Sequence, residues 1–102
     1  MDIRFVDDYI NQKLNENDEF IRYTFYELRV KNNLSQEDTD EFLKLNRTYF
    51  ERKGYKVYVT DDKFTYNGAK MTVQPNELMI IIKNEESRKK RWIYMKHLTK
   101  KK

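Results

Sequence analysis

Cationic side chains crowd the C-terminal part of the chain, where they are interleaved with aromatic residues. Lysine and arginine neutralise phosphates, and an indole ring offers a flat face on which a nucleic-acid base can stack. The pattern therefore predicts an anionic partner, either nucleic acid or a nucleoprotein complex. The candidate binding residues are Arg88, Lys89, Lys90, Arg91, Trp92, Lys96 and Lys100.

The same segment has two other interpretations. It could be the solvated basic face of a helix that docks through Trp92 and Met95. A helix lying on a membrane surface is less favoured, because the apolar stripe is short and contains Arg91. Distinguishing the first two interpretations requires a binding measurement.

Charge is unevenly distributed along the chain. Residues 1–82 contain 12 basic and 15 acidic side chains, a net charge of −3, whereas residues 83–102 contain nine basic and two acidic ones, a net charge of +7. A basic segment on a mildly acidic body indicates that an anionic partner would meet the segment rather than the whole surface. Frequent Asn, Lys, Ile and Tyr are typical of AT-rich genomes, such as those of low-GC bacteria and their phages. From the charge and the placement of the aromatic residues we expect a small non-enzymatic accessory or regulatory protein, of phage or mobile-element type.

A second hypothesis assigns the function to the opposite charge. Acidic faces of small proteins can imitate nucleic acid and occupy a basic channel of a host protein. On this interpretation the chain is an inhibitor or adaptor that binds a host defence or replication component, for example as an anti-CRISPR-like or other anti-defence protein. Its candidate contact residues are Glu37, Asp38, Asp40, Glu41, Tyr58 and Tyr66.

Residues suited to catalysis are few. The chain has no cysteine and one histidine, His97, so thiolate chemistry is excluded and a metal site is disfavoured. The acid pair Asp61-Asp62 is first of all a turn sequence between two strands. No phosphate-cradling glycine loop is present, since the two glycines are Gly54 and Gly68. We expect no enzyme activity, no cofactor and no metal.

Helices should precede the strands. Apolar residues spaced by three and four predict a helix from Ile3 to Leu14. Residues 18–31 are ambiguous: we favour a helix over a strand, but the alternation from Tyr26 to Lys31 would put Tyr26, Leu28 and Val30 on one buried face, and a helix turning into a strand near Phe25 also fits. The clearest element is a helix of about residues 35–53, capped by Ser35 and ended by Gly54, with a buried stripe. That stripe consists of Phe42, Leu43, Leu45, Tyr49 and Phe50.

The segment of about residues 55–83 should form a small antiparallel sheet. Its first strand should place Tyr55, Val57 and Val59 on one face, and Asn67-Gly68 is a strong two-residue hairpin turn. The run Leu78 to Ile82 lacks alternation, which predicts an internal strand with apolar contacts on both faces. We therefore expect an α+β fold in one domain spanning residues 1–102, with helices covering one face of the sheet and residues 84–102 forming a basic C-terminal helix with a frayed tail.

One local resemblance bears on function. The stretch Glu27 to Asp38, ELRVKNNLSQED, resembles the opening of phage-repressor-type helix-turn-helix domains, in which a similar phrase ends the first helix and starts the second. The family pattern then needs a small residue, a glycine turn and a recognition helix. Here LKLNRTYFERK continues helically to Gly54, so the resemblance covers about 12 of 102 residues.

Location and assembly are weakly constrained. The longest apolar run is far shorter than the roughly 20 residues that cross a bilayer, and the first residues, MDIRFVDD, are acidic where a signal peptide is basic and then apolar. We expect a cytoplasmic protein of a bacterial host cell with no membrane partner. A homodimer through an edge strand or the terminal helix is compatible with the sequence.

Overall fold

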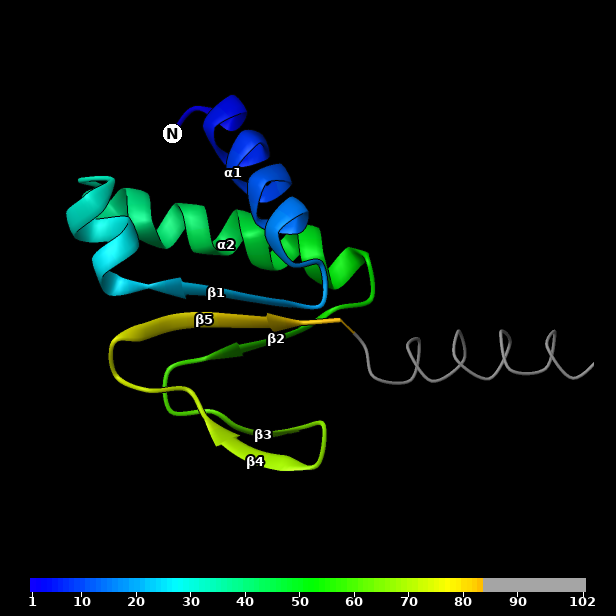
Figure 1. The fold of residues 1–102 in the computed structure, drawn as a ribbon. Helices are drawn as coiled ribbons and strands as arrows, with labels where there is room; N and C mark the ends of the chain where they lie inside the picture. The colour runs from blue at the N-terminus through cyan, green and yellow to red at the C-terminus, as the bar shows by residue number, and fades with distance from the viewer. Residues whose placement is uncertain (84–102) are drawn as a thin grey trace, which may run out of the picture.

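The computed structural model describes residues 1–83 and contains helices and two small antiparallel sheets, which confirms the α+β expectation (Figure 1). The basic C-terminal helix expected at 84–102 lies outside the described residues. In chain order the elements are helix α1 (Ile3–Glu16), strand β1 (Phe20–Thr24), π-helix η1 (Tyr26–Lys31), helix α2 (Gln36–Arg52), and strands β2 (Lys56–Val59), β3 (Lys63–Tyr66), β4 (Ala69–Thr72) and β5 (Glu77–Ile82).

Both long helices form where the sequence places them. In α1 the Asp2 side chain accepts a hydrogen bond from the Arg4 backbone N–H at 2.9 Å, and Val6 and Ile10 are buried. In α2 the Ser35 side chain caps the first turn by accepting from the Asp38 N–H at 3.0 Å, while Gly54 follows the helix at φ +85°. Phe42 and Phe50 of the expected stripe are fully buried, and Leu43, Leu45 and Tyr49 are partly buried.

The helix favoured for residues 18–31 is wrong in its first half. Phe20–Thr24 is a strand paired with β5, and a π-helix follows it, so the order is strand then helix. The expected common face also fails, because Leu28 is buried whereas Tyr26 and Val30 are 65% and 55% exposed. In a strand every second side chain lies on the same face, whereas in a helix residues two apart point in different directions. Leu28 therefore faces the core while Tyr26 and Val30 face solvent.

Strand β5 lies at the centre of the three-stranded sheet, in the order β1-β5-β2, as its unbroken apolar run predicts. Met79 and Ile81 pack in the cluster beneath the helices, together with partly buried Tyr55, Val57 and Val59 from the region of β2. Ile80 and Ile82 pack in a second cluster on the other face. Helices α1 and α2 cover one face of the sheet, and the β3–β4 hairpin lies against the other (Figure 1).

The expected single sheet is instead two sheets. The β3–β4 hairpin turns at Asn67 and Gly68, both at positive φ, and forms its own two-stranded sheet. Its buried Phe64 and neighbouring Val73 cover Ile80 and Ile82. The hairpin separates from β2 at the Asp61-Asp62 turn, where the Asp62 carboxylate accepts from the Val59 N–H at 2.8 Å. The third strand of the main sheet, β1, comes from the N-terminal half of the chain.

Candidate functional site

The candidate nucleic-acid residues of the basic segment, numbers 88–100, lie outside the described residues, as does His97. The structure does show where the chain enters that segment. Lys83 directly follows the central strand, and its backbone N–H donates to the Glu19 carbonyl at 3.0 Å. Its ammonium lies 3.5 Å from the Asp18 carboxylate. The entry to the segment is therefore anchored at one end of the main sheet.

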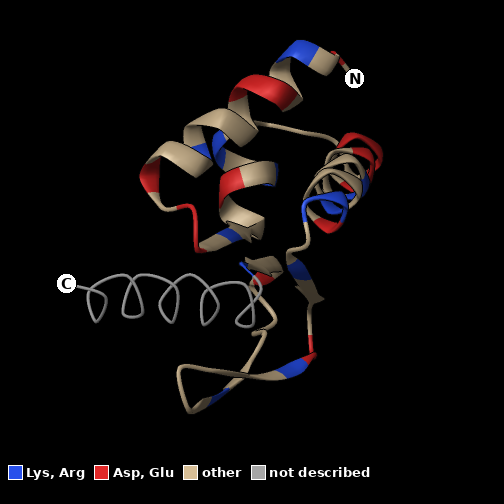
Figure 2. Cartoon of the chain, turned by 90° about the vertical axis from the view of Figure 1, so that its right-hand side faces the viewer, with Lys and Arg blue, Asp and Glu red and all other residues tan. Residues whose placement is uncertain are grey.

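Further cations share that end of the sheet. Lys56 begins β2 and is paired in register with Ile82, and Lys53 caps the C-terminus of α2 just before it. Both are exposed, and neither forms an ion pair within residues 1–83. Figure 2 views the molecule from this side, with blue segments where α2 ends and β2 begins. We call Lys53, Lys56 and Lys83 the basic end.

The acidic residues of the second hypothesis lie together, but its tyrosines lie elsewhere. Glu37, Asp38, Asp40 and Glu41 occupy the first turns of α2, where the helix dipole stabilises negative charge. Tyr58 stacks on Phe64 with ring centroids 4.4 Å apart, and Tyr66 contacts Phe20 at 5.2 Å. These two tyrosines pack against the second cluster, which contains Phe64, Ile80 and Ile82 and lies on the face of the sheet opposite the helices. The six residues therefore do not form one surface, and the tyrosines contribute to packing.

A polar network that the sequence does not reveal joins α1 to η1. The Tyr9 hydroxyl donates to the Glu27 carboxylate at 2.5 Å, and the Lys13 ammonium lies 2.8 Å from the same carboxylate. The Asn32 amide donates to the Tyr9 hydroxyl at 3.2 Å and to the Glu27 carbonyl at 2.7 Å. Burial, followed by the neighbouring Glu27 carboxylate, raises the pKa of Tyr9 well above its usual range. The Tyr9 phenol therefore keeps its proton, and its hydrogen bonds with Glu27 and Asn32 hold η1 against α1.

Beneath this network a buried pair joins β1 to α2. The Tyr23 hydroxyl donates to Asn46 Oδ1 at 2.6 Å, and Asn46 Nδ2 donates to the Phe42 carbonyl at 2.8 Å. Neither side chain is exposed to solvent. Burial, with a smaller effect of Glu27, raises the pKa of Tyr23 well above its usual range. The pair fixes the position of α2 over the sheet.

Removing the Tyr23 hydroxyl should therefore be costly. In Tyr23→Phe the Oδ1 atom of Asn46 loses its donor inside the core, and we expect a loss of about 1–3 kcal/mol in the free energy of unfolding. The double variant Tyr23→Phe/Asn46→Leu should recover part of that loss, because both partners are then apolar. Urea denaturation followed by circular dichroism measures each value. A double variant that loses the full sum of the two single effects would contradict the pair's coupling.

Within residues 1–83 no group of three or more His, Cys, Asp and Glu side chains is arranged to hold a metal ion. The Asp61-Asp62 pair is engaged in its turn, with the Asp61 N–H donating to the Val73 carbonyl at 2.9 Å. In the described part of the chain, no helix has the length and apolar character needed to span a bilayer. After α2 the chain enters β2, so up to Lys83 no recognition helix follows the stretch that resembles a helix-turn-helix opening.

Comparison with known proteins finds no matching family model, no matching curated protein and no matching solved structure.

Proposed function

We propose that this protein is a small non-enzymatic accessory protein that binds nucleic acid, free or within a nucleoprotein complex, through its basic C-terminal segment. The observation that carries the proposal is charge segregation: a net charge of +7 over residues 83–102 against −3 over residues 1–82. Phosphate neutralisation releases condensed counterions from the nucleic acid, which favours binding by a compact run of cations. Trp92 lies within that run and offers a stacking face.

The described part of the chain supports this proposal through the placement of its own cations. The segment begins at Lys83, and exposed Lys53 and Lys56 lie at the same end of the sheet. A nucleic acid held by the segment would meet additional positive charge there, whereas the acidic start of α2 lies at the far end of that helix (Figure 1). Lys53 and Lys56 thus add positive charge at the end of the sheet where the segment begins, which also carries the acidic Asp18 and Glu19.

The proposal is tested by two variants of the full chain that lose equal charge. Replacing Lys89, Arg91 and Lys96 with glutamine should weaken binding to a labelled DNA or RNA duplex or single strand by at least about tenfold, since three phosphate contacts are lost. Replacing the exposed cations Lys44, Arg47 and Lys70 with glutamine should change the affinity much less. Fluorescence anisotropy at fixed low salt measures both. Equal weakening by the two variants would show that net charge, not the segment, determines binding.

A second candidate function is protein binding, and a different observation favours it. Phe25, Tyr26 and Val30 are 46%, 65% and 55% exposed around η1. The Arg29 guanidinium lies 5.5 Å from the Phe25 ring centroid and donates to the Gln36 side chain at the start of α2. Aromatic residues and arginine are enriched at protein interfaces. An inhibitor or adaptor surface would thus combine this apolar patch with the acidic start of α2, in place of Tyr58 and Tyr66.

A further inference from the structure

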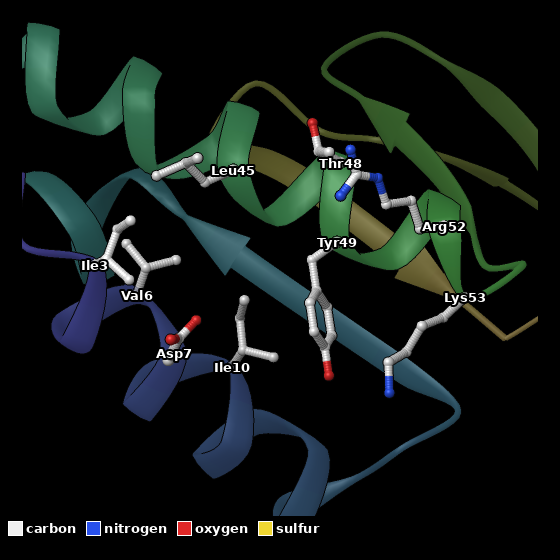
Figure 3. A pocket seen from close by; sticks show the side chains of 9 residues that line it. All are labelled: Ile3, Val6, Asp7, Ile10, Leu45, Thr48, Tyr49, Arg52 and Lys53. Carbon is white, nitrogen blue, oxygen red and sulfur yellow. The ribbon is translucent and has the colours of Figure 1, made fainter.

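A groove with an apolar floor lies where α1 crosses α2 (Figure 3). Its volume is about 390 Å³, which falls in the range of small-molecule sites. Val6 and Ile10 of α1 and Leu45 of α2 supply apolar lining, and the Tyr49 ring forms part of the wall. Ile3 is 65% exposed at one end of the groove. This apolar surface continues the core outward between the two helices.

Three charged side chains line the groove, two cations at one end and one carboxylate on the α1 wall. Arg52 and Lys53 line the end formed by the last turn of α2, and neither pairs with a carboxylate within residues 1–83. On the same helix Arg47 differs, since its guanidinium lies 3.3 Å from the Glu51 carboxylate. The Lys53 ammonium lies 5.1 Å from the Tyr49 ring centroid, which directs it toward the groove. Asp7 on the α1 wall is the one acidic lining residue.

The apolar end and the cationic end are separated along α2. Leu45 and Arg52 are seven residues apart, which corresponds to about 10 Å of helix rise. Figure 3 shows Ile3, Val6 and Leu45 at one end of the groove, with Arg52 and Lys53 at the other. Two cations against one carboxylate leave the groove with a net positive charge. Its shape and charge are complementary to a molecule with an apolar body and one anionic head.

We propose that this groove binds a small anionic amphiphile, of the class of medium-chain carboxylates, with its apolar chain over Tyr49 and Leu45 toward Ile3 and its head at Arg52 and Lys53. The Thr48 hydroxyl, which also lines the groove, provides a further polar group near the head. The site shares Lys53 with the basic end, but none of its lining residues belongs to the basic C-terminal segment. Its occupant would stabilise the crossing of α1 and α2, because it binds the folded state alone.

The test uses the full chain and three probes of equal chain length: octanoate, octanol and octyltrimethylammonium. Titrations followed by ¹H–¹⁵N chemical shifts should show saturable octanoate binding with shifts at the lining residues of α1 and α2. Octanol should bind about fivefold more weakly because it lacks the charge, and the ammonium should bind most weakly. Equal affinity for octanoate and the ammonium, or no saturable octanoate binding, would overturn the proposal; the latter would assign the groove to a macromolecular partner.

Matched variants distinguish octanoate binding in the groove from nonspecific attraction of octanoate to positive charge on the surface. Arg52→Gln should weaken octanoate binding about fivefold, whereas Arg47→Gln, which removes an exposed cation outside the groove, should leave it unchanged. Asp7→Asn should strengthen binding, and Thr48→Trp should abolish it by filling the groove while nucleic-acid affinity stays the same. Equal effects of Arg52→Gln and Arg47→Gln would overturn the assignment of the head to Arg52.

Discussion

Replacing Ile81 with alanine should lower the free energy of unfolding by about 2–5 kcal/mol. Ile81 is fully buried at the centre of the main sheet, in register with Ile21 of β1 on one side and Val57 of β2 on the other. Its side chain belongs to the cluster beneath the helices. Truncation would leave a cavity bounded by paired strands and by α2, and hydrogen-bonded strands cannot move inward to fill it.

Chemical denaturation of the variant and the original protein measures this loss, and Val30→Ala is a suitable control. Val30 is an apolar residue of similar size but is 55% exposed, so its truncation should change stability by less than about 0.5 kcal/mol. Similar small losses in both variants would show that β5 is not the centre of the core. A large loss confined to Ile81 would support the burial of β5 beneath the helices.

Elements with local signals could be predicted from the sequence. Ser35 and Gly54 mark the two ends of α2, because a side-chain cap and a positive φ are properties of single residues. Asn67-Gly68 fixes the β3–β4 hairpin for the same reason. The unbroken apolar run of β5 gave its central position, since a strand covered on both faces needs no polar alternation.

Elements that depend on distant partners could not be predicted in this way. Strand β1 exists because it pairs with β5, as in the Arg22–Glu77 ion pair at 3.4 Å between residues 55 positions apart. Its own residues are compatible with a helix, so tertiary pairing decides the outcome. The π-helix is stabilised in the same manner by contacts of Glu27 with Tyr9 and Lys13.

The candidate sites also differ in whether their residues are close together in the sequence. The basic segment and the acidic start of α2 are contiguous in sequence, so charge counting finds them. The groove combines Asp7 with Arg52, and the polar network combines Tyr9 with Glu27, which only the packing of separate elements brings together. Sequence patterns likewise did not distinguish the exposed Tyr26 from the packed Tyr58 and Tyr66.

Nucleic-acid affinity should depend steeply on salt. If about six cations of the basic segment meet phosphates, the slope of log affinity against log salt should be near −5, because each neutralised phosphate releases about 0.9 counterion. Such a slope corresponds to a roughly 10³-fold loss between about 50 and about 200 mM salt. The acidic body, with 15 acidic side chains over residues 1–82, would not produce such a slope on its own.

Nucleic-acid binding by the basic segment is tested by fluorescence anisotropy of labelled single- and double-stranded DNA and RNA, titrated with the 102-residue chain across that salt range. We expect binding at low salt to at least one of these probes, and a roughly 10³-fold loss of affinity as the salt rises. Absence of binding to all of them at about 50 mM salt, or an affinity that stays constant as salt rises, would contradict nucleic-acid binding by the basic segment.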